Sequence, residues 1–198
     1  MNFFQAIILG IVQALTEYLP VSSSAHIRII GDLMLGADPG AAFTAIIQIG
    51  TELAVILYFR RDIINILSHW FGCLFGKNGP DWRARMGRGD KYATLGWNVI
   101  VGSIPIIILG FTLQNIIETS LRNLWITVTV LFLFGLLLWI VDARSRQIKT
   151  MDDMNYRDAF LFGLGQSMAL IPGVSRSGGT ITVGRALGYT VSYTHLTL

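Results

Sequence analysis

Two short polar segments interrupt apolar stretches of this sequence, and the first, residues 20–26, could support acid–base chemistry. Ser22, Ser23 and Ser24 offer hydroxyls after a proline, and His26 adds an imidazole. A hydroxyl becomes a useful nucleophile when a nearby base takes its proton, and Ser23 and His26 can meet if the backbone between them is helical. The competing interpretation is that the serines cap the next helix and the histidine is an interfacial anchor. At least one serine is expected to serve only as a cap.

The second polar segment, residues 172–180, has the composition of an anion site. It reads Pro-Gly-Val-Ser-Arg-Ser-Gly-Gly-Thr. Small residues permit close approach of the backbone, hydroxyls and amides at a helix N-terminus point donors at an anion, and the guanidinium of Arg176 matches a phosphate. A tight turn whose arginine reaches lipid headgroups would explain the glycines, but not the hydroxyls on both sides of the arginine. We therefore expect this segment to bind phosphate or carboxylate.

A glutamine and a carboxylate precede the first segment on an expected helix. Gln13 and Glu17 stand one helical turn apart, so they share a face from which both can reach the following loop. A carboxylate beside an apolar helix is costly to bury without a partner, which favours a functional or paired role for Glu17 over a place at the water interface. Glu52 lies in another apolar stretch, and we interpret it as a group that supports the site or the helix packing.

The elements that must position these loops are apolar helices. The chain has 198 residues, of which 53% are hydrophobic and 14% charged, whereas about a quarter are charged in an ordinary soluble domain. Residues 41–59, 95–113 and 121–141 are each long enough to cross a hydrocarbon core as a helix. The composition therefore predicts an all-α, multi-pass integral membrane protein.

Several classes of function find no support in the composition. Cys73 is the only cysteine, so no intramolecular disulfide can form, and no cluster of residues suggests zinc. The net charge of +3 is spread through loops rather than concentrated in a tract with aromatics, so no nucleic-acid partner is expected. Glycine motifs for nucleotides and metalloprotease motifs are also absent from the sequence.

Two apolar segments end at the prolines of the polar loops, and the second, with 13 residues, is too short for an ordinary span. Residues 2–19 stop at Pro20 and residues 159–171 stop at Pro172, which is typical of re-entrant or broken helices. Both regions carry Gly-x-x-Gln before the proline and serines after it. This indicates a weak internal repeat with a site near the middle of the membrane, although two Ser/Pro turns that are similar by chance would give the same pattern.

Basic residues indicate the orientation of the chain. They are concentrated in the expected loops 60–94 and 142–158, which the positive-inside rule places on the cytoplasmic side. The connector 114–120, between the two spans that separate these loops, has no Lys or Arg and falls outside. The first polar loop then lies toward the outer leaflet, provided that residues 27–36 do not cross the membrane.

The wider context of both loops resembles one known family. Gln13-Ala-Leu-Thr-Glu-Tyr-Leu-Pro-Val-Ser-Ser-Ser-Ala-His26 and Pro172-Gly-Val-Ser-Arg-Ser-Gly178 are similar to the two signature motifs of the bacitracin-resistance type undecaprenyl-diphosphate phosphatases. The stretches 48–55 and 154–160 also resemble the family, so the resemblance covers about residues 3–190. It implies an all-helical membrane fold with inverted repeats and re-entrant helix pairs, in a single membrane domain over residues 1–190.

The resemblance also implies a reaction and the residues that perform it. Undecaprenyl diphosphate would be hydrolysed to undecaprenyl phosphate and phosphate in the bacterial cell (inner) membrane, which recycles the lipid carrier for peptidoglycan synthesis and confers bacitracin resistance. Ser23 would attack phosphorus, His26 supported by Glu17 would handle its proton, and Arg176 would stabilise charge at a site facing the outer side. A divalent cation, Mg²⁺ or Ca²⁺, would be held by Glu17. The residues expected to bind the substrate are Gln13, Ser22, Ser24, Ser175, Ser177, Gly178 and Thr180.

The end of the sequence departs from the family. After Gly188, and plainly over residues 192–198, the sequence no longer reads as a membrane helix. We interpret the chain as C-terminally truncated, with the second repeat incomplete, and residues 191–198 as a non-native tail whose His195 is excluded from the site. The expected partners are a polyprenyl diphosphate and the lipid bilayer, and a homodimer stays open. The alternative function is a membrane transporter or lipid flippase, because inverted repeats with broken helices are transporter architecture.

Overall fold

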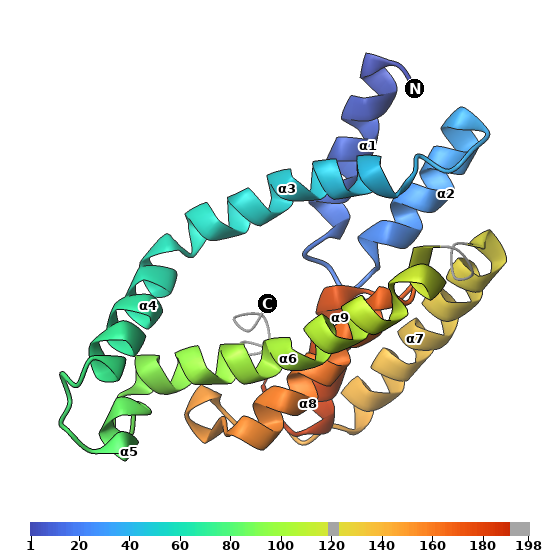
Figure 1. The fold of residues 1–198 in the computed structure, drawn as a ribbon. Helices are drawn as coiled ribbons and strands as arrows, with labels where there is room; N and C mark the ends of the chain where they lie inside the picture. The colour runs from blue at the N-terminus through green and yellow to red at the C-terminus, as the bar shows by residue number, and fades with distance from the viewer. Residues whose placement is uncertain (119–122, 191–198) are drawn as a thin grey trace.

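The computed structural model describes residues 1–118 and 123–190, and Figure 1 shows that they form an assembly of helices. The helices are α1 (Phe3–Thr16), α2 (Ser23–Leu35), α3 (Ala41–Tyr58), α4 (Arg60–Leu74), α5 (Trp82–Arg85), α6 (Lys91–Glu118), α7 (Leu124–Arg144), η2 (Met151–Asp153), α8 (Tyr156–Ser167), η3 (Met168–Leu170) and α9 (Arg176–Ala186). The predicted all-α class is confirmed. The expected non-native tail, residues 191–198 with His195, lies outside the described residues.

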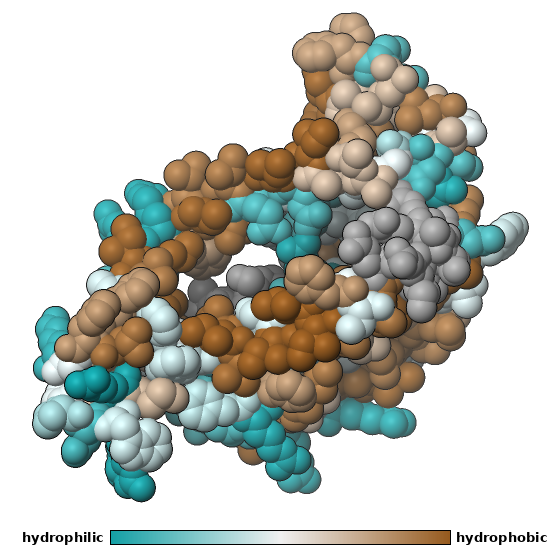
Figure 2. Space-filling model, in the orientation of Figure 1, coloured by the Kyte–Doolittle hydropathy of each residue, from teal (hydrophilic) through white to brown (hydrophobic). Residues whose placement is uncertain are grey.

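Three of the described helices are long and apolar enough to cross a membrane, namely α3, α6 over Lys91–Leu113, and α7. Large apolar side chains on them point outward: Phe111 is 81% exposed and Phe132 is 70% exposed. Apolar residues also cover much of the surface of α3 and α6 in Figure 2. Soluble proteins rarely expose apolar patches of this extent, whereas lipid solvates them. The chain is therefore a multi-pass membrane protein, as predicted.

Two helix–loop–helix units carry the polar segments, and their loops meet near the centre of the molecule (Figure 1). In the first, α1 begins with a capping box between Asn2 and Gln5 and packs against α2. In the second, α8 and η3 lead to the loop from which α9 begins. With 13 residues, α2 is too short to span a bilayer, so the condition set for residues 27–36 is met.

Close glycine contacts hold the second unit in the helix assembly. A Cβ at Gly163 on α8 would overlap the backbone carbonyl of Gly102 on α6, and a Cβ at Gly179 on α9 would overlap the carbonyl of Gly165 on α8. Small residues permit this approach of backbones, which is the usual device of helix packing in membranes. The position of α9, and thus of the second polar loop, depends on these contacts.

The prediction of a continuous loop over residues 60–94 is wrong, because this stretch contains α4, α5 and the start of α6. Apolar residues recur along α4 at helical spacing, as at Ile63, Ile66 and Trp70, while the charged residues of its first turn are exposed. Such a helix can bury one face without crossing the membrane. Accordingly, α4 packs against α6, and the ring of Trp70 meets the ring of Trp97 at 5.3 Å.

A hollow of about 390 Å³ separates α3 and α4 from α6 and α8. An opening between α3 and α6 is visible in Figure 2. Apolar side chains such as Phe59, Ile63 and Phe162 line the hollow, together with Asn98 and Thr180. One of the predicted substrate-binding residues, Thr180, therefore borders this hollow.

Candidate active site

The C-terminal end of α1 brings a carboxylate against the first polar loop. The side-chain amide of Gln13 donates to Glu17 Oε2 at 2.7 Å, and the Ser23 hydroxyl donates to the same oxygen at 2.6 Å. As predicted from their one-turn spacing, Gln13 and Glu17 share a helix face, and Glu17 contacts the loop that follows. Because the Glu17 oxygen accepts from Ser23, it lies where a general base would take the hydroxyl proton.

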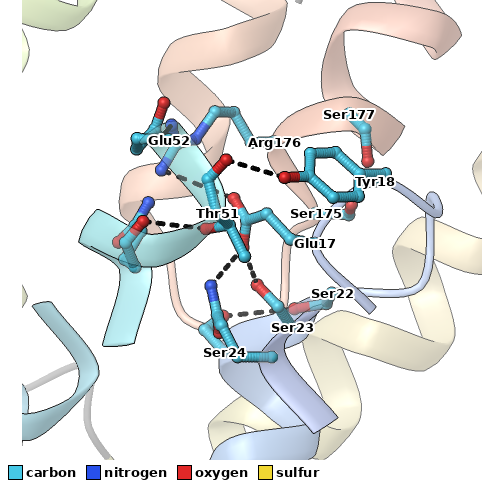
Figure 3. A network of polar contacts seen from close by, with 12 residues as sticks. Glu17, Tyr18, Ser22, Ser23, Ser24, Thr51, Glu52, Ser175, Arg176 and Ser177 are labelled. Atoms are coloured by element: carbon cyan, nitrogen blue, oxygen red, sulfur yellow. Dashed lines mark hydrogen bonds and ion pairs between the residues drawn. The ribbon is translucent and has the colours of Figure 1, made fainter. Parts of the chain in front are cut away.

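The arginine of the second loop reaches the same carboxylate. Arg176 NH2 lies 3.7 Å from Glu17 Oε1, and its NH1 donates to Glu52 Oε1 on α3 at 2.7 Å. Figure 3 shows Glu17, Ser23, Glu52 and Arg176 turned toward one another. Three segments that are distant in the sequence thereby supply one polar cluster, with a potential nucleophile, its proton acceptor and a phosphate-binding guanidinium.

Two serines of the second loop fasten it to the first. The hydroxyls of Ser175 and Ser177 both donate to the carbonyl of Leu19, at 3.4 and 3.0 Å, and Ser175 also caps α9 by accepting from the Gly178 amide at 3.1 Å. Ser175 and Ser177 are buried. In the structure these hydroxyls join the two loops, and their predicted binding of phosphate stays a prediction. The backbone amides of Arg176 and Ser177, at the start of α9, have no acceptor one turn earlier within the helix, and such amides can donate to an anion.

Thr180 and Gly178 make local contacts within the second loop and α9, and their predicted contact with substrate stays a prediction. The Thr180 hydroxyl donates to the carbonyl of Arg176 at 2.9 Å, so its proton is used within its own helix. A Cβ at Gly178 would lie 2.9 Å from the Cβ of Ser175, which indicates that the glycine makes room for the cap. The physical reason is helical geometry, because a threonine within a helix can donate to the carbonyl one turn earlier.

The serines of the first loop make different contacts. Ser22, at a φ of 63°, is the N-cap of α2 and accepts from the Ala25 amide at 3.4 Å, which confirms that one serine caps. The hydroxyls of Ser22 and Ser24 lie 3.2 Å apart. These contacts leave Ser23 as the serine that is bonded to the carboxylate.

The expected contact between Ser23 and His26 is not found among the described residues. His26 Nδ1 lies 2.9 Å from the Ser22 carbonyl, which can only accept, so Nδ1 carries the proton. The imidazole is turned back along α2, whereas the Ser23 hydroxyl points to the end of α1. The Nε2 atom of His26 is therefore the ring nitrogen that stays available, and Glu17 is the side chain that accepts the Ser23 hydrogen bond.

Three residues outside the predicted list, Glu52, Thr51 and Tyr18, lie at the site. Glu52 binds Arg176, and next to it the carbonyl of Thr51 accepts the Tyr18 hydroxyl at 2.7 Å, which ties α3 to the first loop. The sequence signal for Glu52 was a carboxylate within an apolar helix, where a partner is needed. Nothing in the sequence indicates that this partner is an arginine more than a hundred residues away.

The oxygen atoms around Glu17 suit a hard cation. Gln13 Oε1 is buried and has no hydrogen-bond partner in the described structure, while the amide nitrogen of the same side chain touches Glu17. Mg²⁺ and Ca²⁺ prefer oxygen ligands, and Mg²⁺ is commonly held by one or two carboxylates plus substrate phosphates. The described residues include no group of three His, Cys, Asp or Glu that could hold a metal by themselves. Gln13 Oε1 and the Glu17 carboxylate are thus the oxygen atoms at this site that could contribute to holding such an ion.

Comparison with known sequences identifies the family of the chain. The model of the family described as bacitracin resistance protein BacA matches residues 6–194. The chain belongs to this family. Among curated relatives of the BacA family, an undecaprenyl-diphosphatase of Bifidobacterium longum subsp. infantis is 90% identical over 190 residues, which are 96% of this chain and 65% of the relative.

More distant members of the family are also similar over nearly the whole chain. Undecaprenyl-diphosphatases of Bifidobacterium adolescentis and Micrococcus luteus are 72% and 54% identical to it. Each similarity covers 96% of this chain, and 65% and 66% of the respective relative. The chain thus spans slightly less than two thirds of the length of these BacA family members.

Proposed function

We propose that this chain carries the phosphate site of an undecaprenyl-diphosphate phosphatase, which converts undecaprenyl diphosphate to undecaprenyl phosphate and orthophosphate. The observation that carries the proposal is the contact of Ser23, Glu17 and Arg176 across the two loops. The names of the relatives support it. The reaction would recycle the lipid carrier for peptidoglycan synthesis and thereby confer bacitracin resistance.

The proposed chemistry begins with Ser23. Its Oγ attacks the terminal phosphorus while Glu17 takes the hydroxyl proton, a role supported by their 2.6 Å hydrogen bond. The bond between this phosphorus and the bridging oxygen breaks, and undecaprenyl phosphate leaves with that oxygen and its electron pair. Water then hydrolyses the phosphoserine, releases orthophosphate and restores the serine, with His26 Nε2 accepting the water proton. Arg176 and the first amides of α9 stabilise the phosphoryl oxygens.

A divalent cation, Mg²⁺ or Ca²⁺, is part of the proposal. Gln13 Oε1 and the carboxylate of Glu17 would hold it, together with substrate oxygens. When bound, it would neutralise charge on the diphosphate.

We place the site toward the outer side of the bacterial cell (inner) membrane. The basic segments before α6 and after α7 lie together at the lower end of Figure 1, away from the meeting point of the loops, and this supports a cytoplasmic location for that end. The proposed partners are the polyprenyl diphosphate and the bilayer. A homodimer stays a prediction, to be tested by the mass of the protein in detergent.

Phosphate release tests the proposed function. The 198-residue chain and its 90% identical Bifidobacterium longum relative would be purified in detergent and given undecaprenyl diphosphate, each with and without Arg176→Ala or the equivalent change. We expect orthophosphate from the unmodified protein, at least 100-fold less from the arginine variant, and no change with Arg61→Ala on α4. Transfer of lipid across vesicles without phosphate release would overturn the proposal in favour of a transporter or flippase.

A further inference from the structure

The guanidinium of Arg176 lies between two carboxylates rather than facing an open site. NH1 donates to Glu52 Oε1 at 2.7 Å, and NH2 lies 3.7 Å from Glu17 Oε1. Glu52 lies on α3, whereas Glu17 directly follows α1 (Figure 3). The guanidinium therefore contacts carboxylates from two separate parts of the fold. The arginine that should bind phosphate is thus already occupied.

The two carboxylates differ in how firmly they are held. The Glu17 side chain is 11% exposed and also accepts hydrogen bonds from Gln13 and Ser23. The Glu52 side chain is 49% exposed, and within the described structure its carboxylate accepts a hydrogen bond from one side chain, that of Arg176. Glu52 is thus held by fewer contacts than Glu17. Glu52 is therefore the partner that an arriving phosphate can displace.

The charges of this cluster are unfavourable for an unaccompanied anion. Glu17 and Glu52 bring two negative charges, and Arg176 brings one positive charge. A phosphate that binds Arg176 must separate it from Glu52 and then lie beside a carboxylate whose charge is no longer compensated. The neighbouring phosphate and carboxylate repel each other, and this repulsion is stronger at a partly buried site than in bulk water.

We propose that Glu52 is a positioning residue that holds Arg176 in the empty site and makes the binding of the diphosphate depend on an accompanying divalent cation. This inference rests on the proposed function and adds a determinant of its substrate, namely that the site selects the cation complex of the diphosphate over the bare anion. Glu52 does this because its displaced carboxylate needs a positive partner. Neutralising the side chain removes both the competition for Arg176 and that need.

A purely structural role makes the opposite prediction. If Glu52 only stabilised α3 against the second loop, its neutral variant would leave Arg176 less ordered and would weaken phosphate binding under all conditions. The sign of the change in anion affinity therefore separates the two roles.

The test measures binding of inorganic pyrophosphate to the full chain in detergent by calorimetry, once with EDTA and once with excess MgCl₂. We expect Glu52→Gln to bind pyrophosphate about three- to tenfold more tightly than the unmodified protein in EDTA, because the variant removes one carboxylate that repels the anion. The gain in affinity on adding Mg²⁺ should shrink by a similar factor. Glu52→Ala, a second neutral variant, should change in the same direction.

Two controls make the result specific. Glu52→Asp keeps the charge and should keep the dependence on Mg²⁺. Asp152→Asn removes a charge from an exposed side chain that pairs with Lys91 on another surface, and it should change neither affinity. Equal or weaker binding by both neutral variants in EDTA, or the same gain with Asp152→Asn, would overturn the proposal.

The same data separate this inference from the proposed function. Pyrophosphate binding that needs Arg176 but is indifferent to Glu52 contradicts the role of Glu52 alone. Binding that is absent in both media, or unchanged by Arg176→Ala, contradicts the phosphate site and the role of Glu52 with it. With undecaprenyl diphosphate at limiting Mg²⁺, Glu52→Gln should lower KM more than it changes kcat.

Discussion

Replacement of Glu17 by glutamine tests the central contact of the site. Glu17 Oε2 accepts from Ser23 at 2.6 Å and from Gln13 at 2.7 Å, and its side chain is 11% exposed. The amide keeps the shape of the side chain and one acceptor oxygen, but it can neither hold a negative charge nor take a proton at neutral pH. The variant therefore removes the proposed base while disturbing the packing little.

The size of the effect follows from these contacts. Loss of a general base lowers a rate by about 10²- to 10⁴-fold, which corresponds to about 2.7 to 5.4 kcal/mol in the activation free energy. Loss of hydrogen bonds to a charged acceptor lowers the free energy of unfolding by about 1–3 kcal/mol. Since typical domains are stable by about 5–15 kcal/mol, we expect Glu17→Gln to stay folded and to lose phosphate release.

The assay is orthophosphate release from undecaprenyl diphosphate, by this chain and by its Bifidobacterium longum relative, combined with Ser23→Ala in a double-mutant cycle. If Ser23 and Glu17 act as one unit, the double variant should be about as slow as the slower single variant. A Glu17→Gln variant within tenfold of the unmodified rate, or two effects that multiply, would refute the reasoning. Near-normal hydrolysis by Ser23→Ala would instead favour a water activated by Glu17 and His26.

Three further predictions concern packing, pH and metal. Gly179→Ala should lower the free energy of unfolding by about 1–3 kcal/mol, because the added Cβ would overlap the carbonyl of Gly165. Gly110→Ala should not lower it, because open space surrounds that position. Thermal unfolding in detergent measures both variants, and equal unfolding midpoints would contradict the packing. Burial of Asp90 opposes its charged form, but hydrogen bonds from His69 and from backbone outweigh this and lower its pKa. The carboxylate therefore stabilises the fold above its unfolded pKa of about 4, and this stability is lost as the pH falls through the lower folded pKa. Asp90→Asn should reduce the loss of unfolding free energy at acidic pH, and an unchanged dependence of that free energy on pH would contradict the role of Asp90. Removal of divalent cations with EDTA should lower phosphate release at least tenfold, and Mg²⁺ or Ca²⁺ should restore it; full activity in EDTA would refute a required cation.

Local properties of the sequence predicted much of the fold. The apolar stretches at α3, α6 and α7 were recognised because crossing a bilayer requires a length and a hydropathy that one segment possesses by itself. The interruptions near Pro20 and Pro172 were recognised because proline and clustered serines end helices locally. By contrast, α4 was predicted to be loop, because its alternation of charged and apolar residues lowers hydropathy without preventing a helix.

The residue types of the site were likewise predictable from the sequence, whereas their contacts were not. Glu17, Ser23 and Arg176 were singled out because carboxylate, hydroxyl and guanidinium chemistry is a property of the residue types. Their partners were not predictable. Ser23 was expected to meet His26, its neighbour along α2, but it binds Glu17, because the direction of a side chain depends on how α1 and α2 pack.

The sequence alone therefore determined that the helices suit a lipid bilayer and that two polar loops carry the residue types of a phosphate site. Only the tertiary structure decided which groups meet. Arg176 binds Glu52, 124 positions away, and Ser177 binds the Leu19 carbonyl, 158 positions away. Contacts of this range come from close helix packing at glycines and from the need to pair buried polar groups, and neither is encoded in the spacing of neighbouring residues.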